Sequence, residues 1–311
     1  MMENLVSVAT QVAVLFLLMG AGVALRRLRL LDEGAVGGMV NLLMFVVTPC
    51  VIVDCFQRPF DGAVLGSLGL AFAFAVFAHL ALMALSALCV RCRDGDMRRT
   101  LRLAAVFSNA GFMGLPLEQA VLGPRGVFFG AVYIAVFNLF IWSWGVKTMD
   151  AAGTGRGGAW RAVFNPGMVG ILAGFLLFLL SARLPAVAAE AVHHLAGLNT
   201  PLAMVVVGCG LAGARFGRVA RSGCVYVAAV LRLFASPLLL IAVMMPFRRH
   251  LDRDMMLAMV IASSAPVAAL VSIFSAKFRR DVDAGVAIVS GTTLVSILTM
   301  PVVIAVAMAV L

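Results

Sequence analysis

Two stretches of polar and helix-breaking residues interrupt long apolar segments of this chain. They are residues 108–116 (SNAGFMGLP) and residues 263–266 (SSAP). A helix that breaks inside a bilayer leaves backbone N–H and C=O groups exposed, and each costs several kcal/mol unless protein, water or a ligand satisfies it. The freed N-terminal amides favour an anion, whereas freed carbonyls favour a cation or a donor. One such break in each half of the chain predicts a binding site near mid-membrane.

The candidate substrate contacts are polar or helix-breaking residues in these stretches and in neighbouring apolar segments. They are Asn109, Gly111, Pro116, Ser263, Ser264, Pro266, Asn138 and Thr48. Proline and glycine are common in membrane helices, so a single break would indicate a kink only. Asn138 could instead make an interhelical hydrogen bond, worth about 0.6 kcal/mol, and Thr48 could cap a local kink. Two matching breaks favour the binding site.

Arg232 lies near the middle of an apolar segment, and is a further candidate for contact with a substrate. An arginine at that depth costs roughly 2.5–3.5 kcal/mol on insertion scales, so it should face the protein interior and have a partner. The partner could be a substrate carboxylate. It could equally be a set of backbone carbonyls, which would make the role structural.

His79 is the candidate residue for coupling transport to an ion. The pKa of an unperturbed histidine lies near neutrality, so the side chain can carry a proton. A buried neutral histidine with one hydrogen bond is the alternative. No acidic residue lies clearly at mid-membrane, and Glu118 and Asp54 come nearest. The coupling ion is therefore open between H⁺ and Na⁺, which backbone carbonyls at the breaks could bind.

No cofactor or metal site is predicted. Cys89 and Cys92 form a lone C-x-x-C without a second pair. His193 and His194 are interpreted as part of a solvated loop. Residues 208–213 fit the G-x-G-x-x-G pattern but lie in an apolar helical segment without a preceding strand, which excludes the dinucleotide interpretation.

The composition is that of a protein embedded in a lipid bilayer. Hydrophobic residues make up 63% of the chain and charged residues only 12%, whereas soluble domains carry about 25% charged residues. The net charge of +10 comes from basic clusters between apolar runs. These clusters are typical of membrane topology signals, so no nucleic-acid partner is predicted.

Ten apolar segments predict an all-α, multi-pass membrane protein. They are residues 5–25, 36–56, 63–90, 100–122, 126–148, 165–183, 195–214, 221–246, 254–276 and 283–309. The loops after segments 1, 3, 5, 7 and 9 hold most of the basic residues, among them Arg26, Arg99 and Arg280. Basic loops stay on the cytoplasmic side, so both termini are predicted outside.

The ten segments divide into two halves of five, residues 1–150 and 165–311, joined by a flexible cytoplasmic linker at 151–164. An odd number of helices per half makes the second half enter the membrane in the opposite sense. Thr48-Pro49 and Thr200-Pro201, His79 and Arg232, and Pro116 and Pro266 occur at nearly constant offsets. These landmarks predict an inverted repeat with broken fourth and ninth helices.

Several motifs resemble the auxin efflux carrier family of membrane transport proteins. They are residues 41–49 (NLLMFVVTP), the Ser108-Asn109-x-Gly111-Phe112-x-Gly114-x-Pro116 pattern, Asn165-Pro166 and Ser264-Ala265-Pro266. The resemblance implies helices 4 and 9 that cross at their breaks, a scaffold of helices 1, 2, 6 and 7 that could form a homodimer, and a moving bundle. Bacterial members of the family are similar to malate and malonate carriers. The chain lacks the long central loop of the plant carriers, which disfavours auxin.

Together these features predict a secondary active transporter of a small organic anion, a mono- or dicarboxylate such as malate or malonate. It would work in the bacterial inner membrane by alternating access of the elevator type. A passive channel or a membrane sensor of the same fold is the alternative. An intramembrane enzyme is disfavoured, because we find no nucleophile–base pair or paired aspartates.

Overall fold

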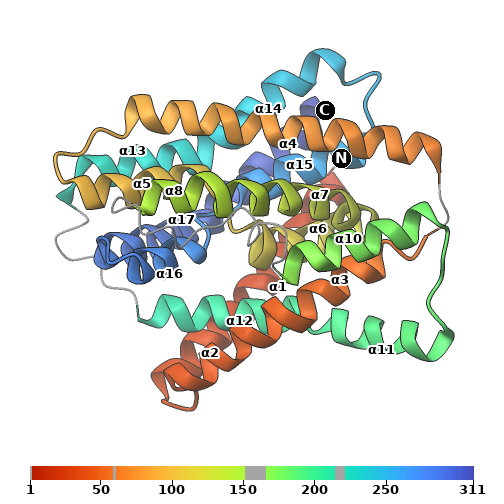
Figure 1. Cartoon of the computed structure of the whole chain (residues 1–311), viewed down its shortest axis with the longest axis horizontal. Helices are drawn as coiled ribbons and strands as arrows, with labels where there is room; N and C mark the ends of the chain where they lie inside the picture. Colours follow the sequence, from red (N-terminus) through yellow and green to blue (C-terminus); the bar gives the residue numbers. More distant parts are fainter. Residues whose placement is uncertain (1, 59–60, 151–165, 214–220) are drawn as a thin grey trace.

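The computed structural model describes residues 2–58, 61–150, 166–213 and 221–311, which fold almost entirely into helices (Figure 1). No strand occurs in these ranges apart from one isolated β-bridge. The predicted all-α class is therefore confirmed. The predicted linker at 151–164 lies outside the described residues.

The first half of the chain contains helices that match the predicted segments closely. They are α1 (Met2–Arg27), α2 (Glu33–Leu42), η1 (Leu43–Val47), α3 (Thr48–Cys55), α4 (Gly62–Cys89), α5 (Gly95–Val106), η2 (Ala110–Gly114), α6 (Leu115–Leu122), α7 (Pro124–Phe140), η3 (Ile141–Gly145) and α8 (Val146–Met149).

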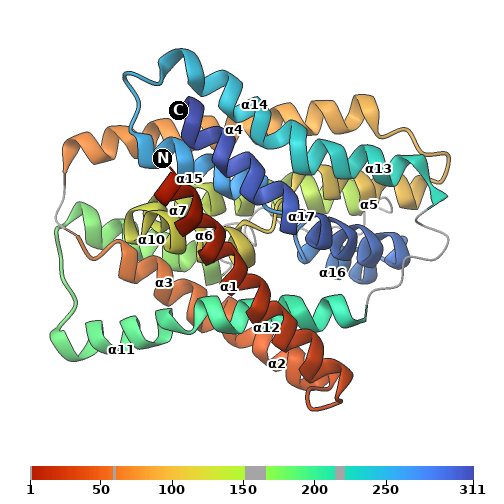
Figure 2. The same ribbon diagram turned by 180° about the vertical axis from the view of Figure 1, so that it is seen from behind.

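The second half continues with a comparable series. It contains α10 (Pro166–Leu179), α11 (Ala186–Gly197), α12 (Asn199–Ala212), α13 (Gly223–Val230), η5 (Leu231–Ala235), α14 (Ser236–Met244), η6 (Met245–Phe247), α15 (Arg253–Ser264), α16 (Leu270–Lys277) and α17 (Val282–Val310). The two ends of the chain lie near each other in both views (Figures 1 and 2).

Six helical stretches of the described chain are long and apolar enough to cross a membrane. They are Glu33–Cys55, Val64–Cys89, Pro124–Met149, Ala186–Ala212, Gly223–Phe247 and Val282–Val310. The pieces of the interrupted segments and the described part of α10 are each shorter than a span. The ten-helix inverted repeat and the outside position of the termini thus stay predictions.

Helices α1 and α12 pack closely across each other, as the view from behind shows (Figure 2). A Cβ at Gly208 would lie 2.0 Å from the Met19 carbonyl oxygen, and a Cβ at Gly22 would lie 2.2 Å from the Val205 carbonyl oxygen. Only glycine permits this approach. The first glycine of the discarded G-x-G-x-x-G pattern therefore serves helix packing.

One predicted loop is wrong. Residues 186–194 were expected between spans but belong to α11, so His193 and His194 lie on a helix. The sequence AVAAEAVHH has good helix formers, and Pro185 precedes it at a position that suits a helix start. Helix α11 packs against α3, and this contact brings His193 towards Asp54.

Candidate functional site

The two interrupted segments meet inside the protein, as predicted. The Asn109 amide donates a hydrogen bond to the Pro266 carbonyl (2.7 Å), and the Ala268 amide donates one to the Phe107 carbonyl (2.9 Å). These bonds form an antiparallel bridge between Ser108 and Val267. Each break thus satisfies part of the other's exposed backbone, which a bilayer interior requires. We call this region, residues 107–109 and 265–268, the crossover.

The second break follows directly from its proline. The residue before a proline avoids the α-helical conformation, and Ala265 is extended at φ −60° and ψ 146°. Helix α15 therefore ends at Ser264.

The first break has a different cause from the one expected. Pro116 is not at the interruption but in the first turn of α6, after the π-helical segment η2. Proline is tolerated in the first turn of a helix because its missing N–H is not needed there. The chain leaves helical geometry earlier, at Phe107 (φ −101°, ψ 114°). Pro116 and Pro266 thus occupy different places relative to the bridge. Their sequence offset, which nearly equals that of the other paired landmarks, therefore does not mark equivalent positions.

Arg232 binds the broken ends of both helices. Its guanidinium is fully buried and donates to the carbonyl of Val106 (2.7 Å), at the end of α5, and to the carbonyl of Ser263, at the end of α15. A third bond goes to the Ser236 hydroxyl. A cation at helix C-termini also complements their dipoles. The geometry favours the structural interpretation of Arg232, in which it positions the crossover.

The remaining polar candidates are held mostly by their own helices. The Ser263 and Ser264 hydroxyls donate to the backbone carbonyls of Val260 and Ile261. The side-chain amide of Asn138 donates to the backbone carbonyl of Ile134. Thr292 links the crossover to α17, because its hydroxyl accepts a bond from the Val267 amide (3.1 Å). The buried hydroxyls of Thr48 and Ser108 have no hydrogen-bond partner among the described residues.

The helix that starts after Asn109 begins with amides that have no acceptor among the described residues. Its first hydrogen bonds run from the amides of Met113 and Gly114 to the Asn109 carbonyl. The amides of Ala110, Gly111 and Phe112 belong to the first turn, which has no acceptor within the helix. A Cβ at Gly111 would meet nothing within 4 Å, so the backbone there borders open space. The arrangement suits an anionic group.

A cavity of about 210 Å³ lies between α6 and α7 on one side and α3, α11 and α12 on the other. It reaches Leu115, one turn beyond Gly111. Asn199 lines it, and the buried side-chain amide oxygen of this residue has no partner in the described part of the chain. The other lining residues are Val51, Asp54, Cys55, Gln119, Pro124, Val127, His193, Ala196, Gly197 and Thr200.

His79 lies apart from this cavity, in an aromatic environment. It is fully buried, and its Nδ1 is 2.8 Å from the Ala75 carbonyl oxygen. The ring stacks on Phe140 at 5.5 Å and also contacts Phe107 and Tyr133. Its Nε2 has no partner among the described residues. Coupling through His79 stays a prediction.

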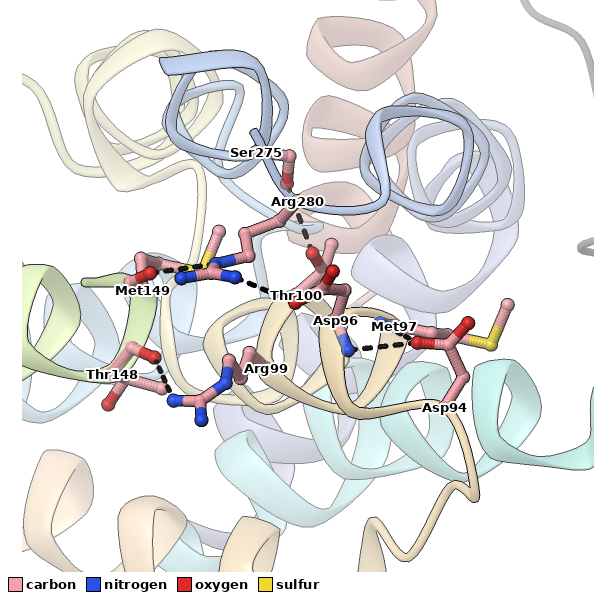
Figure 3. Close-up of polar contacts among 9 residues, drawn as sticks. All are labelled: Asp94, Asp96, Met97, Arg99, Thr100, Thr148, Met149, Ser275 and Arg280. Carbon is pink, nitrogen blue, oxygen red and sulfur yellow. Dashed lines mark hydrogen bonds and ion pairs between the residues drawn. The ribbon is translucent and has the colours of Figure 1, made fainter. Parts of the chain in front are cut away.

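Ion pairs also join the interrupted helices at the ends that lie far from the crossover. At the end of the protein where α5 begins, Arg280 pairs with Asp96 (2.8 Å) and donates to the Met149 carbonyl (2.8 Å) (Figure 3). The hydroxyls of Thr100 and Ser275 lie 3.3 Å apart beside them (Figure 3). Arg280 follows α16 and Asp96 lies in the first turn of α5, so this ion pair joins the end of one interrupted helix to the start of the other.

A matching arrangement occurs where α15 begins. Arg125, just after α6, pairs with Asp252 and with Asp254 (3.0 Å). Asp252 caps α15 through the amide of Met255, as Asp94 caps α5 through the amides of Asp96 and Met97. The D-x-D sequences at 94–96 and 252–254 are a sequence signal that α5 and α15 begin in the same way. The same pattern at both starts supports a twofold relation between the halves.

The C-x-x-C pair separates into two different environments. Cys89 is exposed, whereas Cys92 is buried. Burial, together with the neighbouring Cys224 thiol, raises the pKa of Cys92 to about 12. At the same pH, the fraction of a thiol with that pKa that is ionised to the reactive thiolate is about a thousandfold smaller than for an ordinary cysteine.

We therefore expect a maleimide at pH 8 to label Cys89 rapidly and Cys92 hardly at all in the folded protein. Site-resolved mass spectrometry of the alkylated protein checks this expectation, with the denatured protein as the control in which both label. Equal labelling rates in the folded state would contradict the buried position of Cys92.

Comparison with known proteins places these features in a family context. A family model described as "Membrane transport protein" matches residues 7–157 and 158–304 of the chain. A curated relative from Methanothermobacter thermautotrophicus is described as an uncharacterized transporter. It is 29% identical over 217 residues, which cover 68% of this chain and 69% of the relative.

Proposed function

Because the chain belongs to the membrane transport protein family that its motifs resemble, we propose that it is a secondary active transporter of a small organic anion. Mono- or dicarboxylates such as malate and malonate are the proposed substrates. The observation that carries the proposal is the crossover, where two interrupted helices meet beside backbone amides that have no acceptor in their own helix. A cavity reaches Leu115 of the same helical run. Interrupted helices of this kind form substrate sites in secondary transporters.

The free amides at the start of η2 support an anionic substrate. The N-terminal end of a helix carries a partial positive charge, and its amides point at the ligand. Asn109 stands at this start. The cavity of about 210 Å³ is smaller than pockets for drug-sized ligands, which span roughly 300–1,000 Å³. Its size therefore suits a compact solute.

The packing supports movement of a rigid bundle against a scaffold. The bonds of Arg232 and the ion pair of Arg280 join the interrupted helices to one another, and the ion pairs of Arg125 join α7 to the start of α15. By contrast, the contact of η2, α6 and α17 with α1 and α12 is apolar and rich in methionine: Leu15, Phe16, Met19, Met113, Leu117, Met204 and Met300. Methionine side chains adapt to shifted neighbours, as an elevator movement would require.

The membrane location and the oligomeric state are further parts of the proposal. The protein is multi-pass, and we place it in the bacterial inner membrane with the cavity on the outer side, because the basic loops lie at the opposite end. A homodimer through helices 1, 2, 6 and 7 is part of the same proposal. A passive channel or a sensor is the competing function.

Counterflow in proteoliposomes tests the transport function. Vesicles loaded with unlabelled malate or malonate should take up the labelled anion transiently above equilibrium, because a carrier exchanges one solute for another. An open channel gives no such overshoot. Absence of overshoot and of saturation with both anions would contradict the proposed carrier.

Replacing Asn109 with Ala tests the location of the site. A hydrogen bond to a charged group contributes about 1.5–3 kcal/mol, so we expect roughly tenfold to hundredfold weaker uptake. The backbone bonds of residue 109 remain possible in the variant, and its melting temperature should stay close to that of the parent. Asn41→Ala, at an exposed position of α2, is the control. Unchanged uptake by the Asn109 variant would exclude this residue from the site.

A further inference from the structure

Glu118 is a buried carboxyl group without a partner. Its side chain is fully buried, and neither carboxyl oxygen has a hydrogen-bond partner among the described residues. It lies on α6, in the helical run that begins at Ala110.

The surrounding helices leave a space shaped for this side chain. A Cβ at Gly130 of α7 would lie 1.7 Å from Glu118 Oε2 and 2.7 Å from Oε1. A Cβ at Gly114 would lie 4.0 Å from Oε1 of the same carboxyl. The carboxyl therefore rests against glycine backbone on α7, and residue 130 must lack a side chain to admit it.

No charged group compensates Glu118 from the elements around it. Helix α6 packs against η2, α1, α7, α12 and α15, and Cys55 of α3 is also near the carboxyl. The described titratable side chains on these elements are Arg26, Arg27, Cys50, Asp54, Cys55, Arg125, Tyr133, Cys209, Arg253 and Asp254. None of them bonds to Glu118. Arg125, the nearest arginine in sequence, is paired with Asp252 and Asp254.

An ionised carboxylate without partners is strongly unfavourable in such a place. Burying an isolated charge is so costly that the group neutralises instead, and ionisable residues inside membranes mark ion pathways. Glu118 is therefore held as the neutral acid in this conformation. It differs from the structural residue Arg232, whose charge is met by carbonyl oxygens.

We propose that Glu118 is a proton-binding site that couples transport to a proton gradient. The carboxyl lies one layer behind the cavity wall, because Leu115 and Gln119 of the same helix and Cys55 of α3 line the cavity. When the bundle moves and water reaches the carboxyl, its O–H bond breaks and the proton passes to water, leaving a carboxylate. Reprotonation from the other side resets the site. The coupling role rests on the proposed transport function, whereas the protonated state does not.

Infrared spectroscopy tests the protonated state without any substrate. At pH 7, in a detergent without ester groups, the parent protein should show a protonated-carboxyl C=O band that Glu118→Gln lacks. Glu190→Gln, which alters an exposed glutamate of α11, should keep the band. If the parent shows no such band, or if Glu118→Gln retains it, Glu118 is ionised and the proposal is overturned.

Gradient-driven uptake tests the coupling, with labelled malate and malonate as probes and the membrane potential clamped. One proton per anion lets a gradient of one pH unit support about tenfold accumulation in the parent. Glu118→Gln should give no accumulation above the passive ratio but should keep counterflow, because exchange needs no net proton movement. Glu190→Gln should behave as the parent.

The remaining outcomes separate the two proposals. Full accumulation by Glu118→Gln, or loss of accumulation in His79→Gln alone, would assign coupling elsewhere and overturn the role of Glu118. If the parent shows no counterflow with either anion, the proposed function fails. The infrared result then still decides whether Glu118 binds a proton.

Discussion

Replacing Arg232 with Gln is expected to destabilise the folded protein by roughly 3–5 kcal/mol and to reduce transport of charged and neutral solutes equally. The guanidinium donates to the carbonyls of Val106 and Ser263, which lie at the C-terminal ends of two different helices. A shorter, neutral amide cannot reach both. Carbonyl groups left without a donor in a buried site are then destabilising, and the crossover loses its alignment.

The melting temperature in detergent and uptake of a carboxylate and a neutral analogue provide the measurement. Arg93→Gln, at an exposed position, is the matched control and should change neither quantity. Arg232→Lys should retain part of the stability, because it keeps a positive charge with several donors. A selective loss of carboxylate transport at unchanged melting temperature would instead indicate direct contact between Arg232 and the substrate.

Replacing Gly130 with Ala is expected to destabilise the protein strongly, and a second replacement at Glu118 should restore much of the loss. A Cβ at residue 130 would overlap Glu118 Oε2 at 1.7 Å. Adding a methyl group to a filled interior typically costs about 1–3 kcal/mol. In Glu118→Ala the carboxyl is absent, so the added methyl group has space.

A double-mutant cycle of thermal stability measures this coupling. Residues in contact show interaction energies of about 0.5–3 kcal/mol, whereas distant pairs are nearly additive. Gly66→Ala, where a Cβ meets nothing within 4 Å, controls for the general effect of alanine in a membrane helix. Additive effects of Gly130→Ala and Glu118→Ala would contradict the packing of the carboxyl against α7.

Much of the architecture was predictable from hydropathy and from backbone chemistry. Long apolar runs require helices, and two polar interruptions require partners for their backbone groups. The family resemblance implies that the interruptions at residues 108–116 and 263–266 cross, and the hydrogen bond from Asn109 to Pro266 beside the Ser108–Val267 bridge confirms that they meet. The family resemblance of the same motifs is confirmed as well.

Other parts depended on tertiary packing that the sequence does not encode locally. Pro116 was assigned to a break because proline usually marks one, yet a proline in a first turn is compatible with the helix that follows. Two of the three partners of Arg232 are backbone carbonyls, which every residue carries and which no motif reveals. Likewise, His193 reaches the cavity only because α11 packs on α3.

The crossover has a consequence for the biogenesis of the protein. The bridge, the bonds of Arg232 to Val106 and the ion pairs of Arg125 and Arg280 join residues from opposite halves of the chain. While the ribosome has made only the first half, the carbonyls of Val106 and Phe107 still await their donors, and the membrane interior offers no water in exchange. The nascent segment therefore depends on the insertion machinery to shelter it until residues 232 and 268 arrive, and neither half should mature without the other.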